Sequence, residues 1–186
     1  MTSTPLRIED TARLLGAYSY LEGRLYEVLG AMASDEPLGR AAVLFDELSQ
    51  QHAWHASLFA EHAPQLAGAD PGSLRASTGT PADLALDRVA GAADSAARLA
   101  VLSRAVLPRL VAGYRRHLER ANRSSDAPVI RALRLVVRDE VEAGLECEAL
   151  LEECLAAVDP ARALAEALTV EQLLAPGGPG WVPWPA

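Results

Sequence analysis

The sequence predicts an all-α fold, and three observations lead to this prediction. Ala and Leu occupy more than a third of the 186 positions, whereas aromatic residues make up only 5%. Ala and Leu favour helices, while a β-sandwich would need Val, Ile, Thr and aromatic residues in bulk. Apolar residues also recur every three or four positions, as they do on the inward face of a packed helix. Half of the residues are hydrophobic, so we expect one domain over residues 1–186.

Charge and cysteine usage narrow the class of protein. The net charge is −8 and all 17 basic residues are Arg, which argues against a nucleic-acid-binding face. No apolar run is long enough for a membrane span, and MTSTPLRIED lacks the hydrophobic core of a signal peptide. Cys147 and Cys154 would lie about 10 Å apart along one helix, too far for a disulfide. We therefore expect a reduced, cytoplasmic protein without nucleic-acid or membrane partners.

The first half of the chain predicts two long helices. The first is expected to begin at Thr4–Pro5, with Thr4 as its N-cap, and to end near Ala33. The turn Ser34-Asp35-Glu36-Pro37 then begins the second helix, with Ser34 as the cap, and this helix ends near His62. Residues 64–81 are rich in Gly, Pro, Ser and Thr, which is typical of a long connection.

The second half repeats this organisation. A break is predicted near Gly91–Asp94, and a third helix from about Ser95 to Asn122 should kink at Pro108. A fourth helix is expected to begin at Ser125-Asp126-Ala127-Pro128 and to end near Val158. Short helices are expected to follow, one from Asp159-Pro160 and another from a capping box at Thr169. The Pro- and Gly-rich residues 176–186 should form an irregular tail.

An internal repeat links the two halves. SDEPLGRA (34–41) and SDAPVIRA (125–132) match at an offset of 91, and each is expected at a helix start after a short turn. Duplication would give two antiparallel helix hairpins joined by a long crossover, as a four-helix bundle over residues 5–158. Residues 159–186 would then follow the bundle. The alternative is that Ser-Asp-x-Pro is simply a common way to begin a helix.

The predicted inward stripes carry ionisable residues at mid-height. Glu22 lies in the stripe of the first helix, His52 and His55 in that of the second, and Glu140 in that of the fourth. The stripe of the third helix has no acidic residue at mid-height. The four stripes read Leu15, Tyr18, Glu22, Leu25, Leu29; Phe45, Leu48, His52, His55, Phe59; Leu99, Val106, Leu110, Gly113, His117; and Leu133, Val136, Glu140, Ala143, Cys147, Leu151.

Burying these four groups costs free energy unless they are paired or bind a metal ion. Carboxylates together with imidazoles suit iron, manganese or zinc, and two His with one carboxylate are the ligands of non-haem iron oxygenases. Other partners remain open. Glu22 could pair with Arg24 of a second chain or with a buried Tyr, and Glu140 with Arg138 or His117. The two imidazoles could also be satisfied core histidines. Tyr18, Tyr20 and Tyr26 are expected in the core or the stripes, and both cysteines are expected to act as small hydrophobes.

These features resemble the ferritin-like superfamily of di-iron carboxylate proteins, in which two helices each supply a Glu and two each supply a Glu-x-x-His. Glu22 corresponds to the Glu of the first helix. The segment His52-Ala-Trp-His55 resembles the second-helix motif with His in place of Glu. The segment Asp139-Glu140-Val-Glu-Ala143 resembles the fourth-helix motif with Ala in place of His. The third-helix Glu has no counterpart, since its candidate positions hold Leu110, Ala112 and Gly113.

The resemblance implies an altered site in which Glu22, His52, His55 and Glu140 hold one iron, manganese or zinc ion, with oxidative activity. The register of the second helix stays open, because the repeat offset aligns His52 with Ala143 and makes Ser49-x-x-His52 the alternative motif. A different class of function also stays open, namely a metal-free bundle that binds a partner chain. No nucleophile elbow or phosphate-binding loop indicates a particular reaction or substrate.

The composition of the tail predicts that it packs against another part of the protein or against a second subunit. Trp181 and Trp184 lie among Gly and Pro residues that cannot form a helix, and two exposed Trp side chains would be a liability for a small protein. We therefore expect the tail to pack onto the bundle or onto the second subunit of a homodimer.

Overall fold

The computed structural model describes residues 5–68, 70–77, 79–156, 158–177, 180–182 and 184–185. Every regular element within these residues is a helix and none is a strand, so the predicted all-α class is confirmed. The longer helices are α1 (Ile8–Asp35), α2 (Gly39–His62), α4 (Thr80–Ala90), α5 (Ser95–Val101), α6 (Leu107–Arg120), α7 (Ala127–Leu155) and α8 (Pro160–Leu174). Shorter elements are α3 (Pro71–Leu74), the π-helix η1 (Leu102–Val106) and the 3₁₀ helix η2 (Ala175–Gly177).

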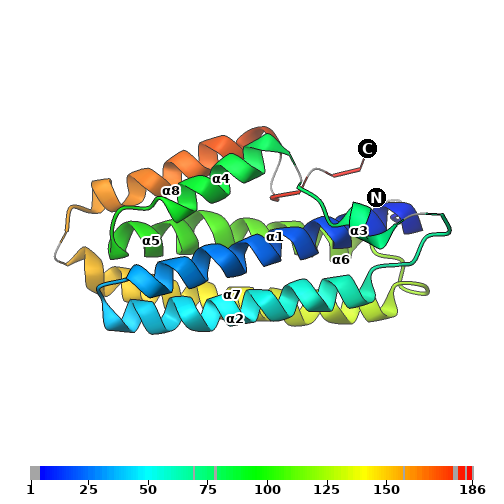
Figure 1. The fold of residues 1–186 in the computed structure, drawn as a ribbon, viewed down its shortest axis with the longest axis horizontal. Helices are drawn as coiled ribbons and strands as arrows, with labels where there is room; N and C mark the ends of the chain where they lie inside the picture. Colours follow the sequence, from blue (N-terminus) through cyan, green and yellow to red (C-terminus); the bar gives the residue numbers. More distant parts are fainter. Residues whose placement is uncertain are drawn as a thin grey trace.

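Four long helical segments lie side by side, with α1 and α7 running in one direction and α2 and α5–η1–α6 in the opposite direction (Figure 1). The helices α1 and α2 form one hairpin, and the continuous segment α5–η1–α6 forms a second hairpin with α7. The crossover between the hairpins contains α3 and α4. Helices α4 and α8 pack against each other in a second layer, where α8 covers α5 (Figure 1).

The core follows the predicted stripes. All positions of these stripes are buried, and the rings of Tyr18 and Phe59 pack there against the ring of Tyr114. Tyr26 departs from the prediction, since its side chain is 47% exposed. It directly follows Leu25 and therefore points about 100° away from the stripe around the helix. Tyr20 is only partly buried.

The ends of the first hairpin differ from the prediction. Helix α1 begins at Ile8 after an extended Arg7, and the predicted cap Thr4 lies outside the described residues. Ser34 belongs to the last turn of α1, where its hydroxyl donates to the carbonyl of Gly30, so it does not cap α2. The turn is instead held by the buried Glu36, whose carboxylate pairs with Arg98 of α5 at 3.0 Å. Helix α2 therefore begins only at Gly39.

The third helical segment contains the expected interruptions. The predicted break at Gly91–Asp94 is present, and the Asp94 side chain caps α5 by accepting from the Ala97 amide at 2.9 Å. In place of a simple kink at Pro108, the helix widens into η1 just before it. Proline lacks an N–H and its ring clashes with the preceding turn, so a wider turn accommodates it.

The C-terminal helices differ from the prediction in where they end and in their number. Helix α7 ends at Leu155, and α8 is one helix instead of two. Thr169 lies inside α8, where its hydroxyl donates to Ala165 O and does not begin a new helix.

The described part of the tail packs onto the bundle, as predicted. Trp181 is 5% exposed, and its indole N–H donates to the carbonyl of Val106 in η1 at 3.2 Å. Arg109 binds the tail as well, since its guanidinium lies 3.4 Å from the carbonyl of Gly180. Among the helices described, none is both long and apolar enough to span a bilayer.

Candidate metal centre

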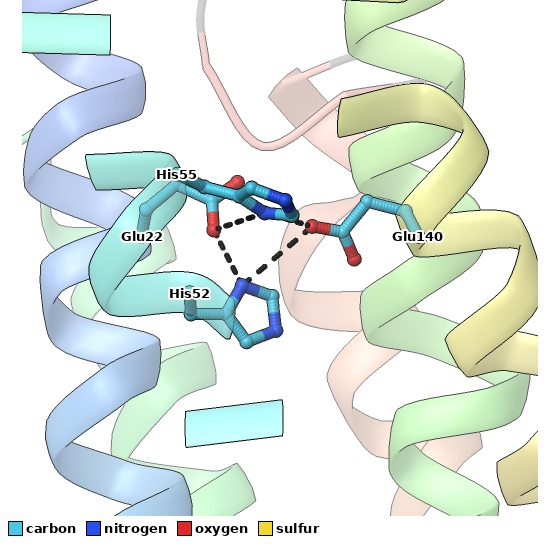
Figure 2. Close-up of side chains that lie close together, drawn as sticks. All are labelled: Glu22, His52, His55 and Glu140. Atoms are coloured by element: carbon cyan, nitrogen blue, oxygen red, sulfur yellow. Dashed lines mark hydrogen bonds and ion pairs between the residues drawn. The ribbon is translucent and has the colours of Figure 1, made fainter. Parts of the chain in front are cut away.

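Four buried side chains from three helices meet at the middle of the bundle. Glu22 comes from α1, His52 and His55 from adjacent turns of α2, and Glu140 from α7, and their polar ends point toward one another (Figure 2). Helical spacing explains the arrangement, because residues three apart on α2 share a face and can aim both imidazoles at the same point. These are the four residues that the sequence predicts as ligands, and the structure brings all of them together.

The distances suit one small ion. One donor atom from each residue can be chosen so that all four lie within 4.8 Å of one another. His55 Nδ1 lies 3.1 Å from Glu140 Oε1 and 3.6 Å from Glu22 Oε2, and His52 Nδ1 lies 3.6 Å from Glu140 Oε1. A tetrahedral ion with bonds of about 2.0–2.1 Å separates its ligands by roughly 3.3–3.4 Å. The remaining pair, His52 Nδ1 and Glu22 Oε2, is in direct hydrogen-bond contact.

Burial and the neighbouring charges together shift the pKa values of the four side chains of this cluster. Each of the four side chains is at most 1% exposed. Burial alone would raise the pKa of Glu22, but the charge and hydrogen bonds of His52 and His55 lower this pKa below its ordinary value. Burial alone would lower the pKa of both imidazoles, yet the two carboxylates raise both, that of His55 to about 10. Burial and the charge of Glu22 raise the pKa of Glu140 against the opposing effect of the histidines.

Two further residues contact the cluster, and the sequence reasoning did not assign them to the site. The Tyr114 hydroxyl donates to Glu22 Oε1, the oxygen that faces away from the histidines. Asp139 Oδ2 lies 3.3 Å from His55 Nε2. A carboxylate on the outer nitrogen of a ligating imidazole fixes the ring orientation and leaves the inner nitrogen free to bind.

Helical spacing could have found both of these residues. Tyr114 lies four positions after Leu110 and three before His117, so it belongs to the stripe of the third helix. Asp139 lies three positions after Val136 and four before Ala143, at the edge of the stripe of the fourth helix.

Two polar atoms of the cluster remain without a hydrogen-bond partner among the described residues. They are His52 Nε2 and Glu140 Oε2, and both are fully buried. Buried polar atoms are seldom left unpaired, because each one costs free energy in an apolar interior. The cluster therefore has binding capacity that its own side chains do not use.

The structure also settles several alternative pairings. Arg138 faces Asp139 and Glu142 instead of Glu140, and Glu140 pairs with the two histidines. Glu22 does contact a buried tyrosine, Tyr114, in addition to the histidines. On the second helix, Ser49 donates to the carbonyl of Tyr26 and stays outside the cluster, so His52 and His55 are the pair that faces Glu22.

The remaining candidate residues lie elsewhere. Glu142, Glu146, Glu152 and Glu153 are exposed on α7. Cys147 is a free, buried thiol, and burial raises its pKa to about 12, which keeps it protonated and unreactive. Cys154 is also free and only partly buried.

The third helix supplies no carboxylate to the cluster. Gly113 lies instead against the tail, where a Cβ on Gly113 would meet Gly180 Cα at 3.6 Å. A glycine here lets the tail backbone approach α6 closely, which a longer side chain would prevent.

No protein-family model, no curated protein and no solved structure matches this chain. The chemistry of the site is therefore the guide to function. Two nitrogen and two carboxylate donors converge in the buried core, and this group could hold one metal ion. Such mixed donors suit iron, manganese or zinc better than calcium or magnesium, which prefer oxygen ligands alone.

Proposed function

We propose that this protein is a ferritin-like bundle that binds one divalent transition-metal ion, iron, manganese or zinc. Glu22, His52, His55 and Glu140 are the proposed ligands. The observation that carries the proposal is the convergence of their four donor atoms within 4.8 Å at the centre of the bundle. Iron held by two histidines and carboxylates supplies oxidative chemistry, which is the activity we propose for the iron-loaded form.

The surroundings of the ligands support this assignment. Asp139 contacts the outer nitrogen of His55, and Tyr114 binds the outer oxygen of Glu22, so both ligands are oriented from behind. A bound ion would take the place of the proton in the hydrogen bond between His52 Nδ1 and Glu22 Oε2.

Metal analysis and a histidine variant test the proposal. Protein purified without added metal should carry an iron, manganese or zinc ion, and metal-free protein should bind Zn²⁺ or Mn²⁺ in calorimetric titrations. His52→Ala should abolish this binding and remove the metal-dependent rise in Tm, because bound metal stabilises only the folded state. His62→Ala is the matched control, since His62 lies at the end of α2 outside the cluster. Metal that stays bound after both His52→Ala and His55→Ala would contradict the assignment.

A second variant tests the orienting carboxylate. Asp139→Asn should weaken Zn²⁺ binding by about 10–100-fold, the usual effect of losing an outer partner of a ligating histidine. Glu142→Gln on the same helix is the control, because Glu142 faces solvent. Equal Zn²⁺ affinities for the two variants would show that Asp139 does not orient His55, without contradicting the assignment of the four ligands.

A metal-free role is the second candidate, and the self-pairing of the cluster favours it. His52 pairs with Glu22 and His55 pairs with Glu140, so the buried charges already compensate one another without an ion. In this case the four residues would fix the register of the helices, and the protein would bind a partner chain, which includes a second copy of itself. Absence of metal from the purified protein together with no Tm response to Zn²⁺, Mn²⁺ or Fe²⁺ would favour this role.

A further inference from the structure

A surface groove lies beside the metal cluster, between the η1–α6 segment and α7. Its volume is about 380 Å³, and Glu140 is one of the residues that line it. The groove therefore borders a proposed ligand from the side of the third helix, which supplies no carboxylate. The π-helix forms part of the wall through Ser103 and Arg104. Such single-turn π-helices often mark functional sites in proteins.

The walls of the groove are apolar. Leu107, Pro108 and Val111 line one side, and Val141 and Leu145 line the other. Val141 is 37% exposed and Leu145 is 67% exposed. These walls can bury the hydrocarbon body of a small ligand, and the volume is in the range of ordinary small-molecule pockets.

Two polar atoms belong to residues that line this apolar groove. Ser103 Oγ and Glu140 Oε2 are buried, and neither has a hydrogen-bond partner in the described part of the chain. Glu140 Oε2 can only accept a hydrogen bond while its carboxylate is ionised, whereas Ser103 can both donate and accept. A ligand hydroxyl matches either atom, because it can donate to the carboxylate of Glu140 or accept from the hydroxyl of Ser103.

The groove favours a neutral ligand over a charged one. The negative charge of Glu140 is already shared with His52 and His55. Arg104 and Glu148, both lining residues, also pair with each other. A ligand cation would lose its hydration in the apolar groove without a free counter-charge, which is costly, whereas a hydroxyl is much cheaper to bury when it is hydrogen-bonded.

We propose that this groove binds a small uncharged molecule with an apolar body and one hydroxyl group, an alcohol or phenol, and places its hydroxyl beside Glu140. The proposal rests on the proposed function, because it makes this molecule the substrate class of the metal site. The groove is open to solvent at Gly144, where an added Cβ would meet nothing within 4 Å. A larger side chain at this position can therefore fill the groove without disturbing the packing of α7.

Benzyl alcohol is the probe, and toluene is the control that lacks the hydroxyl. Binding is followed in ¹H–¹⁵N NMR spectra of the full chain, through the amides of the lining residues Val141 and Leu145, in metal-free and Zn²⁺-loaded protein. Benzyl alcohol should bind roughly tenfold more tightly than toluene, the effect of one net hydrogen bond. In Mn²⁺-loaded protein, the paramagnetic ion should broaden the methylene protons of benzyl alcohol more than its para ring proton.

Two variants give the groove a direct test. Gly144→Leu should weaken benzyl alcohol binding at least roughly tenfold without lowering Tm or changing Zn²⁺ affinity, because it removes volume and no contact. Ala149→Leu, at an exposed position of α7 outside the groove, is the matched control and should bind like the parent. Ser103→Ala should reduce the preference for benzyl alcohol over toluene.

The outcomes separate this inference from the metal assignment. Zn²⁺ binding without any benzyl alcohol binding would overturn the groove proposal and leave the metal site intact. Equal binding of benzyl alcohol and toluene, or binding unaffected by Gly144→Leu, would overturn it as well. Benzyl alcohol binding that is lost in Gly144→Leu, in a protein that takes up no metal, would support the groove and overturn the proposed metal function alone.

Discussion

The two hairpins of the bundle contribute unequally to the buried Glu/His cluster. The first hairpin, α1–α2, supplies Glu22, His52 and His55, which are three of the four cluster residues. The second hairpin, α5–η1–α6 with α7, supplies Glu140 alone. It carries the π-helix, the groove and the contacts with the tail.

The sequence repeat allows the two hairpins to be compared position by position. An offset of 91 relates the two hairpins, and the same offset takes Glu22 to Gly113 and His52 to Ala143. Gly113 contacts the tail, and Ala143 is a small core residue. Two of the three cluster residues of the first hairpin therefore correspond to small residues of the second. The proposed ligands are therefore concentrated in the first hairpin, whereas the second hairpin packs against the tail and borders the groove.

The strongest test of the asymmetry concerns the charges of the first hairpin. Glu22→Leu should destabilise the metal-free protein by about 3–5 kcal/mol, because it leaves a buried partner charge uncompensated. Tyr114 would lose its acceptor as well. The measurement is the free energy of unfolding from urea titrations in the presence of a chelator.

Replacing the whole cluster is the informative control. The quadruple variant Glu22→Leu, His52→Leu, His55→Phe, Glu140→Leu should recover most of the lost stability, since apolar groups of similar volume replace buried ion pairs at little cost. A quadruple variant less stable than Glu22→Leu would show that the four residues do not act as one compensated unit.

The next test concerns the tail on the second hairpin. Trp181→Ala should lower the free energy of unfolding by about 3 kcal/mol, because it removes a large buried side chain. It also removes the hydrogen bond to Val106 O in the π-helix. Trp54→Ala is the control, since Trp54 is 48% exposed and should matter much less. Equal effects of the two substitutions in urea titrations would mean that the tail is not held in solution as the structure shows.

Sequence reasoning predicted the core and the cluster better than the helix ends. Periodicity alone identified the stripes and the four clustered residues, because residues three or four apart on a helix must share a face. The helix starts depended on side chains that reach across the fold. Ser34 has a good capping residue type, but the ion pair of Glu36 with Arg98 of a distant helix decides where the turn lies.

Features that arise between segments could not be read from the sequence. The groove needs the spacing of η1–α6 from α7, and the π-helix beside Pro108 is a backbone response that no motif encodes. The packing of Trp181 onto the bundle was predicted, but its partner Val106, 75 positions away in the sequence, was not. Helical periodicity gives the direction of a side chain, whereas tertiary packing gives its partner.

The histidines of the two hairpins have pKa values shifted in opposite directions, so their effects on stability should depend differently on pH. The carboxylates raise the pKa of His52 and His55, whereas burial lowers the pKa of His117 on α6 from 6.5 to about 4, despite the opposing charge of Asp126. Between these two values the unfolded chain binds a proton at His117 that the folded chain does not. Stability should therefore fall as the pH drops through this window, by on the order of 2 kcal/mol between about pH 7 and pH 5.

The variant His117→Phe isolates this contribution, because it keeps an aromatic ring beside Tyr18 and Trp184 and removes the titrating group. The difference in unfolding free energy between parent and variant should change with pH across the window and level off above it. A difference that stays constant from neutral to acidic pH would show that His117 is hydrated or paired in solution.

The smallest predicted changes in stability come from replacing two glycines, one in each hairpin. A Cβ on Gly16 of α1 would lie 2.3 Å from the carbonyl oxygen of Leu74, so the first hairpin packs tightly against α3. Gly16→Ala should therefore cost about 1–3 kcal/mol, since the short α3 segment must shift. Gly144→Ala on α7 meets open space and should instead stabilise the protein by up to about 1 kcal/mol, through its higher helix propensity. Opposite signs in the same denaturation assay would fit a closely packed first hairpin and an open face on the second. A destabilising Gly144→Ala would mean that something already fills the groove at Gly144.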